Sequence, residues 1–259
     1  KIYKMERRNL FVLVIIVICS FSCKNSKRPD DCFVYIGGIF FETSRIEWGQ
    51  IQAGKRYNKL IKVYNPNSQD ITFTFNEIIP YVEIKQAHDN RDREFRDILI
   101  PAHSCDSLLI ILTAPDSIGY FSKNIHIKVN TEIYLKPIEL FATVIESFEN
   151  QDIEKTPTLE VKYDIFCFDT LSQKNKIEAS FPIKNTGNRD LIIRKVETTC
   201  TCTYCSLTKN VIKPGESVVL EVIFNPANRF GVQYKYVRIF SNDPKRPLLE
   251  FTIKGFVKE

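Results

Sequence analysis

The sequence lacks the local motifs that mark the common enzyme classes. It has no G-x-S-x-G nucleophile elbow, no phosphate-binding P-loop, no H-E-x-x-H zinc motif and no G-x-G-x-x-G dinucleotide fingerprint. Its three histidines all lie in the first half of the chain, so a cysteine nucleophile in the second half would need a distant histidine base. We therefore expect a protein that is not an enzyme and that binds no cofactor.

The amino-terminal apolar stretch, Leu10–Phe21, is too short to cross a bilayer, because a membrane-spanning helix needs roughly 20 apolar residues. A basic segment precedes this stretch, and the small residues Ser20 and Ser22 close it. These are the three regions of a secretory signal peptide, which we expect to occupy residues 1–22 with its translated start at Met5. A membrane-spanning helix is the alternative interpretation.

Cys23 follows this segment and resembles the lipidated cysteine of bacterial lipoproteins, whose thiol receives a diacylglycerol. The leucine that usually stands three residues earlier is Ser20 here, and Ser20 with Ser22 also suits ordinary cleavage. We expect lipidation at Cys23, with residues 23–31 as a polar tether. The resemblance implies a membrane-anchored protein of the bacterial cell envelope, at the outer membrane, facing the periplasm or exposed at the surface.

The sequence also lacks a strong excess of either charge. Its formal charge of +5 comes partly from the targeting segment, and the chain from Cys23 onward has 32 basic and 30 acidic residues. This balance does not support a nucleic-acid-binding surface. We expect no nucleic-acid partner.

Glycine is scarce, and β-favouring residues are abundant: nine glycines stand against 19 phenylalanines and 11 tyrosines. No segment shows the 3.6-residue apolar period of a helix, whereas Ile177, Ala179, Phe181 and Ile183 alternate with polar residues as in a strand. Pro182 would delete a ladder hydrogen bond, so this strand should be an edge or carry a bulge there. The composition predicts an all-β protein.

Turn signals recur at offsets between 110 and 120 residues, which suits a duplicated domain. Asn65-Pro66-Asn67 corresponds to Asn185-Thr186-Gly187, and Gly119 corresponds to Gly231. Each repeat has about seven short strands, which is typical of an immunoglobulin-like β-sandwich. We expect two tandem immunoglobulin-like sandwiches over residues 32–148 and 159–259, joined by a linker over residues 149–158.

The second repeat resembles a bacterial family of lipoproteins of unknown function. The segments that carry the resemblance are FPIKNTGNRDLIIRKVETTCTCT, VIKPGESVVLEVIFNP and VRIFSNDPKRPLLEFTIKGFV. Domains of this family are similar to the immunoglobulin-type domains of Hydin and major sperm protein. The resemblance is close over Ile177–Val257 and weak over Ile46–Val144. It implies the fold and an envelope location, and Thr201 stands where the family pattern Cys-Gly-Cys-Thr has glycine.

Three cysteines, Cys200, Cys202 and Cys205, form the only dense cysteine cluster of the sequence. The first interpretation is a structural disulfide, for which Cys202–Cys205 or Cys200–Cys205 is geometrically easier than Cys200–Cys202. The second is a zinc or copper site, which would need Cys167 or an outside group as a fourth ligand because the second repeat has no histidine. The third is a redox pair at Cys202 and Cys205, although no helix is expected there to lower a thiol pKa.

Three further cysteines lie in the predicted domains. A disulfide between Cys32 and Cys105 would staple the first domain, but the pairing cannot be deduced from the sequence. Trp48 and Phe168 occupy equivalent places and are predicted to be core anchors. With Phe168 turned inward, Cys167 should point outward as a free thiol.

Recognition residues are expected on loops, as is common for sandwich domains. We expect the charged loop 85–97 and the cysteine loop 200–210 to occupy the same connection in the two repeats. The binding-loop candidates are His88, Asp89, Arg91, Arg93, Arg96 and Tyr204.

The predicted function is a non-catalytic, lipid-anchored binding or scaffolding module. Its partner would be another envelope protein or a glycan, and strand addition at a sheet edge is a suitable binding mode. The first alternative is a metal-handling envelope protein that uses the cysteine cluster. The second alternative is an envelope thiol-redox protein.

Overall fold

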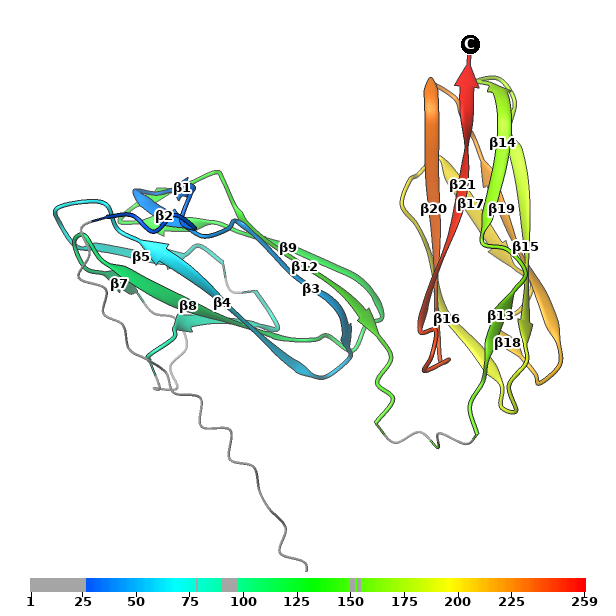
Figure 1. Ribbon diagram of the computed structural model, residues 1–259, viewed down its shortest axis with the longest axis horizontal. Coiled ribbons are helices and arrows are strands. Elements are labelled where there is room, and N and C mark those ends of the chain that lie inside the picture. Colours follow the sequence, from blue (N-terminus) through cyan, green and yellow to red (C-terminus); the bar gives the residue numbers. More distant parts are fainter. Residues whose placement is uncertain (1–26, 78, 90–96, 150–151, 153–154) are drawn as a thin grey trace, which may run out of the picture.

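The computed structural model describes residues 27–77, 79–89, 97–149, 152 and 155–259, and these contain strands and no helix. The strands form two sandwiches, each with its own apolar core (Figure 1). The predicted all-β class with two tandem immunoglobulin-like sandwiches is therefore confirmed. The predicted signal peptide and Cys23 lie outside the described residues. No helix within the described ranges is long and apolar enough to cross a membrane.

The second sandwich has the strand order of an immunoglobulin-like domain. One sheet has the order β13-β15-β19-β17, which matches the A-B-E-D order of that fold. The other has the order β14-β21-β20-β16-β18, in which the first four strands match A′-G-F-C and the short strand β18 is added at the edge. The strands are β13 (Leu159–Val161), β14 (Ile165–Ser172), β15 (Ile177–Asn185), β16 (Leu191–Thr198), β17 (Thr203–Leu207), β18 (Val211–Ile212), β19 (Ser217–Phe224), β20 (Gly231–Ser241) and β21 (Leu248–Lys258).

The first sandwich repeats this topology with two differences. The short hairpin β1–β2 extends one sheet to the order β1-β2-β4-β8-β6, and the other sheet is divided into β3-β12-β9 and β11-β10-β5-β7. The division falls at His126, which separates β9 from β10. The strands are β1 (Val34–Ile36), β2 (Ile39–Phe41), β3 (Arg45–Gln52), β4 (Arg56–Tyr64), β5 (Ile71–Phe75), β6 (Val82–Gln86), β7 (Ile98–Ile100), β8 (Cys105–Thr113), β9 (Gly119–Ile125), β10 (Ile127–Val129), β11 (Glu132–Ile133) and β12 (Ile138–Ile145).

Alternation of side chains builds the second core, as the sequence pattern predicts. Ala179, Phe181 and Ile183 of β15 are buried, while their neighbours along the strand face solvent. Pro182 pairs with Val219 of β19, and the short strand β13 on the other side pairs only with residues 183–185. Pro182 thus lies where β15 is an edge, which confirms the prediction.

A buried asparagine at the end of two equivalent strands, β4 in the first domain and β15 in the second, shows the duplication most directly. Asn65 donates to the carbonyl oxygens of Gln69 and Ile100, both at 2.9 Å. Asn185 donates to those of Arg189 at 2.7 Å and Ile212 at 2.8 Å. In each domain the asparagine Oδ1 accepts the backbone N–H two residues later. Both side chains are fully buried, so the predicted equivalence of the two turns is confirmed.

The predicted equivalence of Trp48 and Phe168 is also confirmed, because both lie in the same irregularity of the sheet. The pairing of β3 with β12 shifts at Trp48, and the pairing of β14 with β21 shifts at Phe168. Phe168 is buried and Cys167 is exposed, as expected. The residue opposite Phe168 is Gly255, where an added Cβ would collide with the Phe168 carbonyl oxygen and ring.

The last residues of the predicted linker are held on the second sandwich. Asn188 N–H donates to the Thr156 carbonyl oxygen at 3.2 Å, and Thr186 N–H donates to that of Thr158 at 3.0 Å. This segment lies so close to Gly187 that an added Cβ there would collide with its backbone. The residue needed at position 187 is therefore glycine.

Candidate functional site

The cysteine cluster lies in the connection that crosses from one sheet of the second sandwich to the other. β16 ends at Thr198 and β17 begins at Thr203, so Cys200 and Cys202 occupy the turn between them. They are joined by a disulfide, with their Cα atoms 5.1 Å apart. The turn lies at the end of the sandwich far from the linker, because Thr203 and Ile177 both pair with Phe224.

The expectation that Cys205 would be the easier disulfide partner is wrong. Cys205 belongs to β17, where Thr203, Cys205 and Leu207 turn toward the core and Tyr204 turns outward. Strand geometry thus directs the Cys205 thiol away from the turn, and burial raises its pKa. The cluster is divided into a disulfide in the turn and a separate thiol packed on the core.

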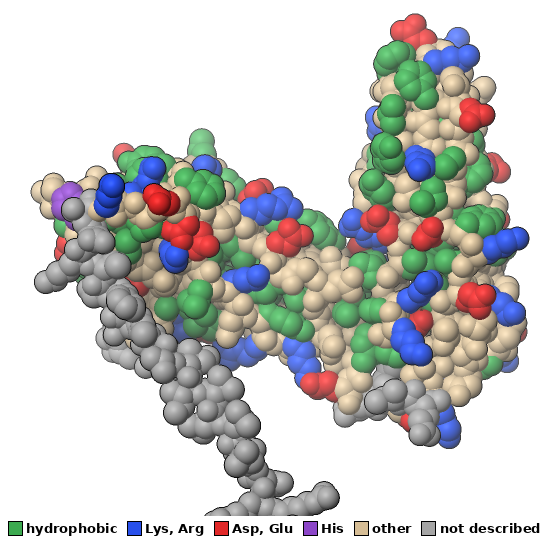
Figure 2. Space-filling view, viewed as in Figure 1, with side chains coloured by type: hydrophobic (Ala, Val, Ile, Leu, Met, Phe, Trp, Pro, Cys, Tyr) green, Lys and Arg blue, Asp and Glu red, His purple; other side chains and the backbone are tan. Residues whose placement is uncertain are grey.

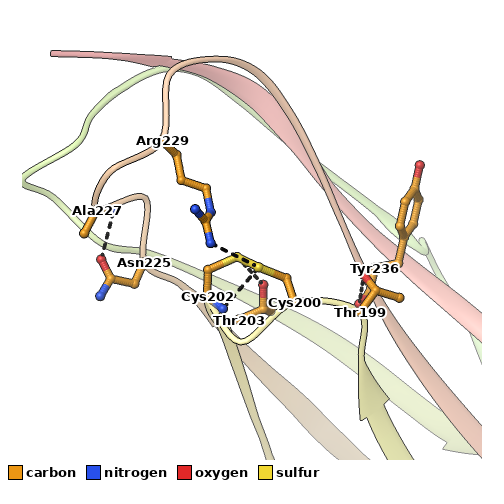
Figure 3. Close-up of a disulfide and its surroundings, with 8 residues drawn as sticks. All are labelled: Thr199, Cys200, Cys202, Thr203, Asn225, Ala227, Arg229 and Tyr236. Atoms are coloured by element: carbon orange, nitrogen blue, oxygen red, sulfur yellow. Dashed lines mark hydrogen bonds between the residues drawn. A yellow bond between two sulfur atoms is a disulfide. The ribbon is translucent and has the colours of Figure 1, made fainter. Parts of the chain in front are cut away.

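Two donors converge on the sulfur of Cys200 (Figure 3). The Arg229 guanidinium donates to Cys200 Sγ at 3.5 Å, and the Cys202 backbone N–H donates to the same sulfur at 3.2 Å. Cys202 Sγ instead contacts the neutral Thr203 hydroxyl at 3.8 Å. The two sulfurs therefore differ in electrostatic environment.

The metal interpretation of the cluster is not supported by the geometry. Within the described ranges, no three His, Cys, Asp or Glu side chains come together as a group that could hold a metal ion. While Cys200 and Cys202 are joined, neither can offer the thiolate that zinc or cuprous copper requires.

Beside this turn, half of β20 forms an open sheet edge. β16 pairs with β20 only over Val237–Ser241. On the edge of β20 that faces β16, the backbone hydrogen bond nearest the start of β20 runs from Thr199 N–H to the Tyr236 carbonyl oxygen. Because successive residues of a strand direct their backbone groups to opposite sides, Val232 and Tyr234 face the same side as Tyr236. Among the described strands, none pairs with β20 on this side over residues 231–235. Val232 and Tyr234 therefore present backbone donors and acceptors at an open edge.

The open edge is accompanied by exposed apolar side chains. Phe230, Val232 and Tyr234 are 66%, 65% and 54% exposed, and Phe256 on the neighbouring strand β21 packs its ring 6.0 Å from that of Phe230. Figure 2 shows hydrophobic side chains on the upper part of the second sandwich, where Figure 1 places β20 and β21. An exposed apolar cluster beside unpaired backbone groups is typical of an interaction site.

The corresponding edge of the first sandwich is more polar. β9 pairs with β12 on one side, and β5 pairs only with β10, which follows β9 in the chain. The exposed residues of β9 are Tyr120, whose ring stacks on Phe141, and the polar residues Ser122, Lys123 and Asn124. The two domains thus share the open edge, with fewer exposed apolar side chains along it in the first.

The two predicted binding loops do not occupy the same connection. The charged segment follows β6, whereas Cys200 and Cys202 precede β17, which is the counterpart of β6. Successive connections lie at opposite ends of a sandwich, so the residues that follow β6 as far as Asp89 and the disulfide turn lie at non-equivalent ends, and that expectation is wrong. Only residues 208–210 of the predicted cysteine loop correspond to the charged segment.

Two of the predicted binding-loop residues lie just after β6. His88 is exposed with its Nδ1 3.5 Å from Asp106 Oδ1, and Asp89 N–H donates to the Gln86 carbonyl oxygen at 3.0 Å. Tyr204 is 60% exposed on β17. Arg91, Arg93 and Arg96 lie outside the described residues.

In the first sandwich, Cys32 and Cys105 are both thiols rather than disulfide partners. Burial, followed by the nearby charges of Asp31 and Cys105, raises the pKa of Cys32 to about 11. Cys105 pairs with Tyr64 of β4, and Lys62 of the same strand contacts Asp31, so the two thiols lie on one face of the sheet. The proposed staple between them is not formed in this structure.

Sequence reasoning missed Arg229 and the open edge. Arg229 lies 29 residues beyond Cys200 in a turn with no recognisable motif, so only the fold brings it to the sulfur. The alternation of Phe230, Val232 and Tyr234 just after Asn225-Pro226 was the one available signal of an apolar outer face.

One solved structure supports the fold of the whole chain. A protein of unknown function from Porphyromonas gingivalis W83 is 18% identical, with a TM-score of 0.61 over 85% of this chain and 100% of that chain. The ASH/PapD-like domain 7 of human CEP192 is 14% identical, with a TM-score of 0.35 over 43% of this chain and 92% of that domain. No curated protein matches the sequence. Residues 159–257, which make up the second sandwich, match the family model of DUF1573, a protein of unknown function.

Proposed function

We propose that this protein is a non-catalytic binding module of the bacterial cell envelope, anchored through a lipid on Cys23, whose second sandwich captures an extended segment of another envelope protein. The observation that carries this proposal is the open edge of β20. An extended segment added there would pair with the backbone groups of Val232 and Tyr234 and continue the sheet where β16 leaves it.

Side chains at this edge favour a protein segment over a glycan. The exposed residues Phe230, Val232, Tyr234 and Phe256 offer apolar contacts, while the pairing groups are backbone amides and carbonyls in register with a strand. Backbone pairing supplies affinity, and alternate side chains supply selectivity. The loop candidates His88 and Asp89 lie on the other domain and are not required for this mode.

The test of strand capture compares two substitutions at one position. Val232→Pro removes a backbone N–H from the open edge, whereas Val232→Thr keeps the N–H and nearly the same shape. Each variant would be purified from envelope extracts after cross-linking, and co-purifying proteins would be quantified by mass spectrometry. We expect Val232→Pro to lose a partner that the unmodified protein and Val232→Thr retain.

Circular dichroism would first confirm that Val232→Pro is folded, and Tyr234→Pro would repeat the test two residues along. Equal retention by both proline variants would contradict strand capture. Equal loss in Val232→Thr would point to apolar contact without strand pairing and would also contradict it.

The lipid anchor is tested separately. Cys23→Ala should abolish acyl incorporation measured by intact mass, and should move the protein from the detergent-soluble membrane fraction to the aqueous fraction. An unchanged membrane fraction for this variant would reject lipid anchoring at Cys23 while leaving strand capture open to its own test.

A further inference from the structure

The two sulfurs of the disulfide turn differ in access as well as in their contacts. Cys200 is half-buried at the margin of the core, between the exposed residues Thr199 and Thr201, and is the more exposed of the two cysteines. Cys202 is only 8% exposed and belongs to the core cluster. Access is one of the factors that decide which sulfur of a disulfide is attacked, so this difference favours attack at Cys200.

The surroundings of Cys200 favour a sulfur that carries negative charge. Arg229 and the Cys202 N–H both donate to Cys200 Sγ, and a charged donor stabilises a thiolate more than a thiol. Lys235 is close enough to Arg229 that, after burial, the charge of Arg229 lowers the pKa of Lys235. Two cations therefore lie at this end of the sandwich, and they provide the electropositive environment that a helix N-terminus provides in other reactive thiol sites.

We propose that Cys200 and Cys202 form a thiol–disulfide exchange site in which Cys200 is the sulfur that bonds to the partner and Cys202 is the resolving sulfur. This activity goes beyond the proposed binding function and does not rest on it. It also differs from the pair suggested by sequence spacing, because Cys205 faces the core on β17.

The exchange has two steps. A thiolate of a partner dithiol attacks Cys200 Sγ, the bond between Cys200 and Cys202 breaks, and Cys202 leaves as a thiolate that takes a proton from water. The second thiolate of the partner then attacks the first partner sulfur, which is bonded to Cys200 in the mixed disulfide. This attack forms the partner's disulfide and releases Cys200 as a thiolate facing Arg229. Two partner thiols become one disulfide, and the site gains two electrons. To return them, the Cys200 thiolate attacks the disulfide of a second protein and forms a mixed disulfide with it. Cys202 then attacks Cys200 Sγ, which re-forms the bond between Cys200 and Cys202 and releases the second protein as a dithiol.

The substrate class is a pair of thiols on an extended or unfolded polypeptide. Phe230 follows Arg229 directly and is 66% exposed, and Tyr204, on β17 just after the turn, is 60% exposed. These apolar side chains would hold a flexible segment near Cys200 without selecting its sequence.

The test uses the full chain equilibrated with mixtures of reduced and oxidised glutathione. After alkylation, peptide mass mapping would report the state of each cysteine. We expect the bond between Cys200 and Cys202 to open in the folded protein. We also expect Cys202→Ser to accumulate glutathione on Cys200, and Cys200→Ser to accumulate none on Cys202.

The Arg229→Met substitution keeps both cysteines and guards against misfolding of the cysteine variants. In the reduced protein it should slow the alkylation of Cys200 by iodoacetamide about three- to tenfold, because an adjacent cation shifts a thiol pKa by about one unit in a half-exposed site. Arg238→Met, in which the lost ion pair is with Glu250 on β21, should leave this rate unchanged. The exposed thiol of Cys167 serves as the internal standard.

A disulfide that stays closed in all glutathione mixtures until the protein is denatured would overturn the proposal. Glutathione found on Cys202 in preference to Cys200, or equal alkylation rates with and without Arg229, would overturn the assignment of Cys200 as the partner-bonding sulfur.

Discussion

At the scale of single residues, the two domains depend on one buried asparagine each. Asn65 and Asn185 each bond two carbonyl oxygens and one N–H, and the bonds to the carbonyl oxygens of Ile100 and Ile212 are buried. Replacing either side chain by a methyl group would leave those groups unsatisfied, which costs about 1–3 kcal/mol for each buried group. The asparagine is therefore a structural requirement of this sandwich and not a binding residue.

The paired variants Asn65→Ala and Asn185→Ala should each destabilise only their own domain, by about 2–4 kcal/mol. Trp48 is the only tryptophan, so its fluorescence follows the unfolding of the first sandwich, while circular dichroism follows both. In urea, Asn65→Ala should shift the fluorescence transition and Asn185→Ala should shift only the dichroism. The exposed Asn175→Ala is the control, and a shift of the fluorescence midpoint by Asn185→Ala would contradict the independence of the domains.

At the scale of strands, the irregularity at Trp48 and Phe168 shows how one architecture accepts different residues. In the first domain the residue opposite the bulge is Ala142, which is buried without collision. In the second domain it is Gly255, and the Phe168 carbonyl oxygen and ring fill the space that a Cβ would need. The two strands β3 and β14 are therefore equivalent in pairing but not interchangeable in packing.

Gly255→Ala should destabilise the second sandwich by about 1–3 kcal/mol, because overpacking at Phe168 must displace β14 from β21. The reverse change in the first sandwich, Ala142→Gly, should cost only about 0.5–1 kcal/mol through backbone entropy. Urea unfolding followed by circular dichroism and Trp48 fluorescence separates the two effects. A Gly255→Ala protein as stable as the unmodified one would show that Phe168 moves aside freely.

Much of the strand arrangement could be predicted from the sequence, because two-residue alternation and turn residues are local signals. Ile177–Ile183 and the turns at Asn65 and Asn185 belong to this class. The disulfide pairing could not be predicted, since it depends on where β17 begins. The contact of Arg229 with Cys200 could not be predicted either, because it joins two turns that only the folded sandwich brings together.

At the scale of the whole molecule, the two sandwiches touch through polar side chains of β16. Arg194 forms two hydrogen bonds with the Glu146 carboxylate, both at 2.8 Å, and Lys195 Nζ donates to the Ile118 carbonyl oxygen at 3.0 Å. Exposed ion pairs of this kind contribute about 0–1 kcal/mol, so they bias the arrangement of domains more than they stabilise either fold.

Arg194→Ala should widen the distribution of distances between the two sandwiches while changing the unfolding free energy by less than about 1 kcal/mol. Spin labels on the two domains and pulsed dipolar spectroscopy would measure the distances. Arg238→Ala removes a similar ion pair, with Glu250 at 2.8 Å, that lies within one sheet, and it should leave the distribution unchanged. Identical distributions for all three proteins would refute a role of Arg194 in orienting the domains.

The hydrogen bonds of Thr156 and Thr158 to the second sandwich shorten the part of the linker that is free to move between the domains. Glu149 is tied to Lys55 on the other side, so the chain between 149 and 156 reaches at most about 25 Å even when fully extended. The effective concentration of one domain at the other is therefore about millimolar, as expected for a short linker. A partner with two extended segments could engage the edges of β9 and β20 together, and its residence time would then reflect avidity and not the affinity of either edge alone.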